Sequence, residues 1–130
     1  MLYIDANIIL RYILDDHAKL SPMAREIIGE NIVGTPIEVI CEVVYVLTKT
    51  YGINRKDIAA TLLDFYESTN AVLSHREAVL KGIEYFGEKT LDFVDCIFAG
   101  YYEKENITVR TFDERLNKLL NIITEEKNRI

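Results

Sequence analysis

Short apolar segments alternate with segments that carry helix signals along the whole chain, and this alternation is the strongest constraint on the fold. Strands that alternate with helices form parallel sheets whose two faces are covered by helices. The sequence therefore predicts an α/β fold, a three-layer α/β/α sandwich with a short parallel central sheet. We expect its strands at residues 2–5, 31–34, 71–73 and 107–111, with a last edge strand at 121–124.

Start signals place the helices between these strands. Ser21-Pro22 combines a capping residue with a proline at the first helical position, and Asn54 and Asp113 are typical N-caps. Two segments, residues 35–38 and 74–77, match the capping-box pattern. These signals predict helices over residues 8–14, 22–29, 36–51, 55–67, 75–87, 92–105 and 114–120.

The chain of 130 residues is long enough for one domain with a substantial core, and 49% of its residues are hydrophobic. No internal repeat, low-complexity tract or linker interrupts it. We therefore expect a single domain over residues 1–130. The absence of a leader pattern at the N-terminus and of an apolar run of membrane-spanning length favours a cytoplasmic protein without a membrane contact.

Four acidic residues, Asp5, Glu42, Asp95 and Asp113, each interrupt or end an apolar run. In open parallel sheets, ligands bind outside the carboxyl ends of the strands. Asp5 and Asp113 follow predicted strands, and Asp95 lies in the first turn of the helix before residues 107–111. Glu42 reaches the same place only if its helix packs across the strand ends. The sequence thus predicts one acidic pocket.

Each acid also has a simpler interpretation. Asp5 and Asp113 could be helix caps, and Asp95, with Asp92 three residues before it, could be a favourable carboxylate in a first helical turn. Glu42 could belong to a stripe of solvent-facing side chains on its helix. These interpretations hold one at a time, but together they do not explain why the fold brings all four acids to one edge.

A ligand set made only of carboxylate oxygens suits Mg²⁺ or Mn²⁺. Such sites hydrolyse phosphodiester bonds without a side-chain nucleophile. The formal charge of −6 argues against nucleic-acid binding by charge alone, but bound cations would reverse the local field. Asn7, Thr111 and Asp92 are predicted to support the site. The cations expected to hold adjacent phosphates, unless they are merely solvent-exposed, are Arg11, Arg110, Arg115 and Lys118.

Four segments of the chain resemble PIN-domain endoribonucleases, especially the VapC-type toxins of toxin–antitoxin pairs. These segments are IDANIILRYILDD, EVICEVVYVLTKTYGI, LDFVDCIFAG and TVRTFDERL. The motif acids of that family fall on Asp5, Glu42, Asp95 and Asp113, with Asn7 and Thr111 in supporting positions and Asp92 as an occasional extra acid. One departure is Ala6, where the family more often has a hydroxyl residue.

The resemblance implies cleavage of RNA with Mg²⁺ or Mn²⁺, a homodimer, and inhibition by a cognate antitoxin protein that occupies the active-site groove. A non-enzymatic alternative is a catalytically silent PIN-fold module that binds RNA or acts as a scaffold, although such a module should lose its acids. A phosphatase with an aspartate nucleophile fits poorly, because Asn7 stands where that class needs a second acid.

Overall fold

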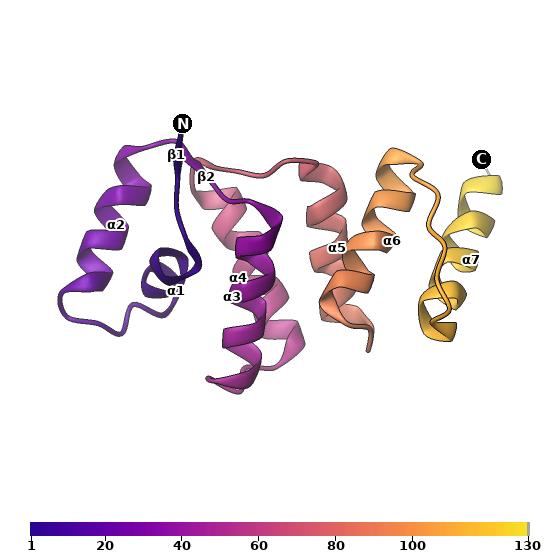
Figure 1. Ribbon diagram of the computed structural model, residues 1–130, viewed down its shortest axis with the longest axis horizontal. Coiled ribbons are helices and arrows are strands. Elements are labelled where there is room, and N and C mark those ends of the chain that lie inside the picture. Colours follow the sequence, from indigo (N-terminus) through magenta and orange to yellow (C-terminus); the bar gives the residue numbers. More distant parts are fainter. Residues whose placement is uncertain (130) are drawn as a thin grey trace. The chain divides into compact units, whose positions relative to one another are not determined.

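The computed structural model describes residues 1–129, which form seven α-helices and three short β-strands (Figure 1). The chain divides into two compact units, Met1–Ser74 and the part from His75 onward. The elements of the first unit are β1 (Leu2–Tyr3), α1 (Ala6–Leu14), α2 (Leu20–Glu30), β2 (Val33–Gly34), α3 (Ile37–Lys49), α4 (Arg55–Ser68) and β3 (Ala71–Val72). Those of the second unit are α5 (Arg76–Glu88), α6 (Phe93–Glu105) and α7 (Glu114–Asn128).

The sheet lies in the first unit and consists of parallel strands in the order β1-β2-β3. Leu2 pairs with Val33, and Val33 pairs with Ala71. Two helices connect each pair of neighbouring strands, α1 and α2 in the first crossover and α3 and α4 in the second. The predicted α/β class with a short parallel sheet is confirmed.

Hydrophobic periodicity accounts for the helices around this sheet. In α3, the side chains of Ile40, Val43, Val44 and Leu47 are buried at the spacing of one helix face. At the carboxyl end of β2, the buried Thr35 hydroxyl donates to the carbonyl of Val72 and shares a hydrogen bond of 2.8 Å with Tyr66. A buried hydroxyl needs such partners, so the end of the sheet is closed by polar contacts.

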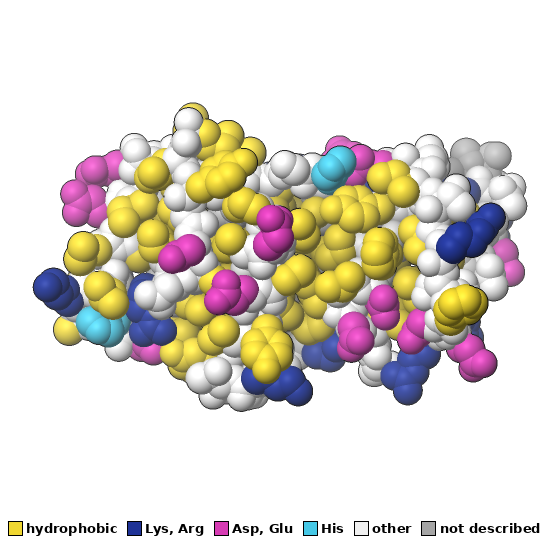
Figure 2. Space-filling model, viewed as in Figure 1, with side chains coloured by type: hydrophobic (Ala, Val, Ile, Leu, Met, Phe, Trp, Pro, Cys, Tyr) yellow, Lys and Arg dark blue, Asp and Glu magenta, His cyan; other side chains and the backbone are white. Residues whose placement is uncertain are grey.

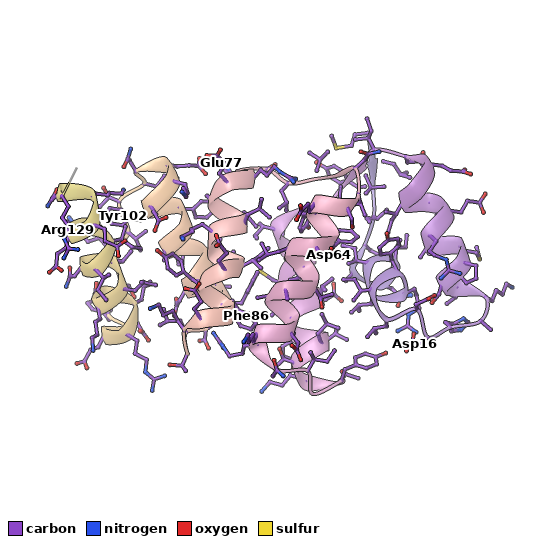
Figure 3. The ribbon with its side chains drawn as sticks, turned by 180° about the vertical axis from the view of Figure 1, so that it is seen from behind. Asp16, Asp64, Glu77, Phe86, Tyr102 and Arg129 are labelled. Atoms are coloured by element: carbon purple, nitrogen blue, oxygen red, sulfur yellow. The ribbon has the colours of Figure 1, made fainter. Side chains whose placement is uncertain are left out.

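Helices α5 and α6 of the second unit pack unusually close to each other. A Cβ atom placed on Gly100 would overlap the carbonyl oxygen of Ala78, and one placed on Gly82 would lie 2.9 Å from the Cα of Ile97. Phe86 of α5, labelled in Figure 3, meets Phe93 of α6 edge to face, with ring centroids 5.4 Å apart. Glycine is required where two helix backbones approach this closely.

Two of the predicted strands are wrong. The segment 107–111 forms no strand, and the described part of the second unit contains no strand with which it could pair. Residues 121–124 lie inside α7 instead of in an edge strand. There the helical spacing of the buried side chains of Leu116, Leu119, Leu120 and Ile123 outweighs the β-branched composition of the segment.

Both predicted capping boxes are also wrong. The hydroxyl of Thr35 is committed to Tyr66 and Val72, so α3 begins after Pro36 without a side-chain cap. Helix α5 begins after His75, which has a left-handed backbone conformation and gives no side-chain cap. Among residues 1–129, no helix combines the length and the apolar character needed to cross a membrane.

Candidate active site

Asp5 and Asp113 each cap the helix that follows them. An Oδ1 oxygen of Asp5 accepts a hydrogen bond from the backbone N–H of Ile8 at the start of α1 (3.2 Å). The Oδ1 of Asp113 accepts from the backbone N–H of Leu116 at the start of α7 (2.9 Å). Both side chains are exposed. Capping therefore accounts for one oxygen of each carboxylate and fixes its direction, while the residue stays open to solvent.

Three acids of the second unit influence one another. Asp95 lies in the first turn of α6, and Asp92 occupies the position just before that helix. Burial raises the pKa of Asp95 above its usual value of 3.8, and the negative charges of Asp113 and Asp92 raise it further. Like charges raise a carboxyl pKa only when they lie near it. The structure therefore brings Asp92, Asp95 and Asp113 into one electrostatic group.

Glu42 lies in the middle of α3 in the first unit, and its side chain is exposed. Three other residues of the same helix, Glu38, Tyr45 and Lys49, are also exposed and continue the same stripe. This is the solvent-facing stripe that formed the simpler interpretation of Glu42. Figure 2 shows acidic and hydrophobic side chains mixed over the visible surface of the helices. The role of Glu42 as a ligand remains a prediction.

Thr111 and Asn117 hold the backbone that carries Asp113. The hydroxyl of Thr111 accepts a hydrogen bond from the backbone N–H of Asp113 (3.0 Å), and the side-chain amide of Asn117 donates to the carbonyl of Thr111 (2.9 Å). These contacts fix the residue on each side of Phe112. The position predicted for a supporting threonine is therefore in contact with the predicted acid. Asn7, the other supporting residue, is exposed in the first turn of α1.

The three arginines predicted to hold phosphates differ in their surroundings. Arg11 donates to Asp16 (2.9 Å) and to the hydroxyl of Tyr51 (3.0 Å), so its guanidinium group already has partners. Arg115 is exposed and donates to a backbone carbonyl, that of Thr90 (3.3 Å). Arg110 is exposed as well. Arg110 and Arg115 are thus better placed than Arg11 to meet an anion.

Two residues near these acids were not among the predicted site residues. Phe112 stands between Thr111 and Asp113, and its side chain is fully exposed. Lys89 lines a pocket together with Arg115 and Lys118. Its pocket neighbours on α7 are at least 26 residues away along the chain, so only the packing of the second unit could reveal this group.

The donor chemistry of the acidic residues fits a hard divalent cation, since carboxylate oxygens are the ligands that Mg²⁺ and Mn²⁺ prefer. The repulsion on Asp95 also fits, because a cation would relieve it. Within residues 1–129, however, no three His, Cys, Asp or Glu side chains are arranged so that they could hold a metal ion together. The residues thus fit a metal ion by their chemistry. The structure brings Asp92, Asp95 and Asp113 into one electrostatic group but does not arrange three ligands among the described residues around one point.

One of three comparisons with known proteins gives a match. No curated protein and no solved structure matches the chain. The family model of the PIN domain matches residues 2–120, which is nearly the whole chain. PIN domains are typically nucleases and typically use divalent metal ions. The chain therefore belongs to the PIN domain family.

Proposed function

We propose that this protein is an endoribonuclease that depends on Mg²⁺ or Mn²⁺, and that it is the toxin of a toxin–antitoxin pair. The observation that carries the first part is the electrostatic group of Asp92, Asp95 and Asp113 in a PIN domain. The negative charges of Asp113 and Asp92 raise the cost of ionising Asp95, which reduces stability unless a cation or a proton compensates it. A nuclease site that binds a divalent cation would explain why the protein keeps these acids together.

In this proposal Asp5, Glu42, Asp95 and Asp113 bind the metal. When bound, the metal would lower the pKa of a water molecule and neutralise charge on the scissile phosphate. Asn7 and Asp92 support the ligands, and the Thr111 hydroxyl holds the backbone of Asp113 in place. Arg110 and Arg115 hold neighbouring phosphates of the RNA, since neither has a carboxylate partner among residues 1–129.

The test is cleavage of a mixed cellular RNA pool by the purified protein, with Mg²⁺, with Mn²⁺ and with EDTA. Asp95→Asn and Asp5→Asn should abolish cleavage. Asparagine caps a helix as well as aspartate does, so the second change removes charge and keeps the start of α1. Asp64→Asn is the matched control, because Asp64 is an exposed acid on α4 (Figure 3) outside the proposed site.

Discrete fragments that need metal and disappear in both site variants would support the nuclease. Cleavage that survives EDTA, or that survives both substitutions, would refute it. The alternative, a catalytically silent RNA-binding or scaffold module, predicts a folded protein that retains RNA and cuts none of it. The two proposals therefore differ in a single experiment.

The toxin role and the two proposed protein partners are tested separately. The proposed partners are a second copy of the chain, in a homodimer, and an antitoxin. Induced expression of the wild-type protein should arrest growth of the host cell, and expression of Asp95→Asn should leave growth normal. Co-expression of a protein encoded beside the gene should restore growth. Light scattering on the purified chain should give twice the monomer mass of 15.0 kDa. Normal growth under strong expression of an active nuclease would contradict the toxin role and leave the nuclease intact.

A further inference from the structure

A pocket of about 330 Å³ lies in the second unit between the segment after α5 and one face of α7. This volume is at the lower end of the range of about 300–1,000 Å³ that is usual for sites of small ligands. We call it the basic pocket. It is lined by Lys89, Thr90, Leu91, Arg115, Lys118, Leu119 and Ile122.

The charges in the basic pocket all have one sign. Lys89, Arg115 and Lys118 line it, and no acidic residue does. Within residues 1–129, none of these three cations forms an ion pair with a carboxylate. The chain as a whole carries a net charge of −6. Unpaired cations in one pocket repel one another, and an anion bound in the pocket would attract all of them.

Three other lining residues, Leu91, Leu119 and Ile122, are apolar, and we call them the apolar floor of the pocket. Leu91 and Leu119 are buried, and Ile122 is 40% exposed, so the apolar side chain of Ile122 meets solvent in the pocket. Arg115 is held at one side by its hydrogen bond to the carbonyl of Thr90 (3.3 Å). A ligand that matches both features combines a negative group with a flat, weakly polar body. A nucleotide has this form.

The basic pocket is adjacent in the chain to the acids of the proposed active site. Leu91 directly precedes Asp92, and Arg115 is two residues after Asp113. The two segments that form the pocket are therefore the same segments that place the acids at the starts of α6 and α7. The pocket and the acids therefore share the chain segments 89–92 and 113–122.

We propose that the basic pocket binds one nucleotide of the RNA substrate next to the cleaved bond, with its phosphate on the cations and its base on Ile122. This inference rests on the proposed nuclease function. The pocket takes an unpaired nucleotide, because bases are exposed for such contacts only in single strands, loops and ends. An acidic peptide would satisfy the cations, but it would leave the apolar floor without a use.

The first experiment locates the ligand. Full-length protein labelled with ¹⁵N is titrated in EDTA with a nucleoside 5′-monophosphate and, separately, with inorganic phosphate. The nucleotide should shift the amide signals of Leu91, Arg115, Leu119 and Ile122, whereas phosphate alone should shift fewer of them and bind more weakly. Equal affinity for both probes would overturn the role of the apolar floor. Shifts that avoid these residues would overturn the site.

The second experiment separates charge from apolar packing. Binding of a short single-stranded RNA to the full chain is measured in EDTA by fluorescence anisotropy at several salt concentrations. Removing one cation that neutralises a phosphate should reduce the slope of log affinity against log salt by about 0.7. We expect that reduction for Lys89→Gln and for Lys118→Gln. Ile122→Ser should weaken binding of the nucleotide and leave the slope unchanged.

Lys104→Gln is the matched control, because Lys104 is an exposed lysine of the same unit that already has a carboxylate near it, Glu103 at 3.7 Å. An unchanged slope in both pocket variants, or the same change in the control, would refute the proposal. So would an acidic peptide that displaces the RNA while the nucleoside monophosphate does not. If the pocket tests fail while the wild-type protein still cleaves RNA with metal, only the pocket assignment is refuted. If the wild-type protein shows no metal-dependent cleavage, the nuclease function is refuted.

Discussion

Replacing Gly100 by alanine should destabilise the protein, because α5 and α6 approach each other at this residue. The added Cβ would overlap the carbonyl oxygen of Ala78 and would lie 3.0 Å from the backbone nitrogen of Gly82 and 3.1 Å from the carbonyl carbon of Ala78. All three obstacles are backbone atoms of α5. A side chain could rotate away, but a helix backbone has to move as a whole.

The size of the effect follows from two opposing contributions. Overpacking in a closely packed core typically costs about 1–3 kcal/mol, and the backbone obstacles place Gly100→Ala at the upper end. Alanine favours a helix over glycine by about 1 kcal/mol, which offsets part of that cost. The net loss is about 2 kcal/mol. At roughly 4 °C per kcal/mol for a chain of this size, the melting temperature should fall by about 8 °C.

Thermal unfolding followed by circular dichroism measures this change, and Gly29→Ala is its control. Gly29 is also helical, near the end of α2, but a Cβ placed there would meet no atom within 4 Å. That variant should melt at the wild-type temperature or slightly above it. If Gly100→Ala melts as high as Gly29→Ala, the backbones of α5 and α6 do not approach each other closely at Gly100.

Further predictions concern the acids and their surroundings. Asp95→Asn should raise the melting temperature at neutral pH in EDTA, because the raised pKa of Asp95 in the folded protein means that its ionised form destabilises the fold. This gain in melting temperature should shrink as the pH falls toward 3.8, since Asp95 then becomes protonated, and a gain that grows on acidification would contradict the reasoning. Asp113→Asn should keep the hydrogen bond to the N–H of Leu116, whereas Asp113→Ala should cost about 1 kcal/mol of cap energy, which urea unfolding can compare. Millimolar Mn²⁺ should raise the melting temperature of the wild-type protein and not that of Asp95→Asn, since a ligand of the folded state shifts unfolding; equal shifts would place the metal elsewhere. Phe112→Ser should change the free energy of unfolding by less than about 0.5 kcal/mol, because Phe112 is fully exposed, and a larger loss would show that its ring packs against the protein.

Helix starts that depend on one local hydrogen bond could be predicted from the sequence. Asn54 accepts the backbone N–H of Asp57 at the start of α4, as expected of an N-cap, and Asp113 does the same for α7. Two predictions that failed depend on distant partners, whereas the Ser21 cap failed locally, because α2 begins at Leu20 and the Ser21 hydroxyl accepts from the backbone N–H of His17. Thr35 matches a capping pattern, but Tyr66 lies 31 residues further along the chain and takes its hydroxyl. The segment 107–111 has strand composition, but composition does not supply a neighbouring strand.

The same distinction applies to the candidate site. Asp92 and Asp95 could be grouped from their spacing on one helix, and their interaction with Asp113 appears in the folded second unit. The contact between Arg11 and Tyr51 could not be predicted, because Tyr51 is 40 residues away from Arg11 in the chain. Lys89 could not be associated with α7 either. In each case a side chain with many available conformations found its partner only through tertiary packing.

The capping role of Asp5 and Asp113 has an evolutionary consequence. Serine, threonine and asparagine cap a helix nearly as well as aspartate, but none of them carries a charge. A gene copy released from selection for its activity could therefore exchange either acid for one of these residues and still encode a stable protein. Descendants that have lost the activity should accumulate such exchanges at positions 5 and 113 first, whereas alanine there should be rare because it would also weaken α1 or α7.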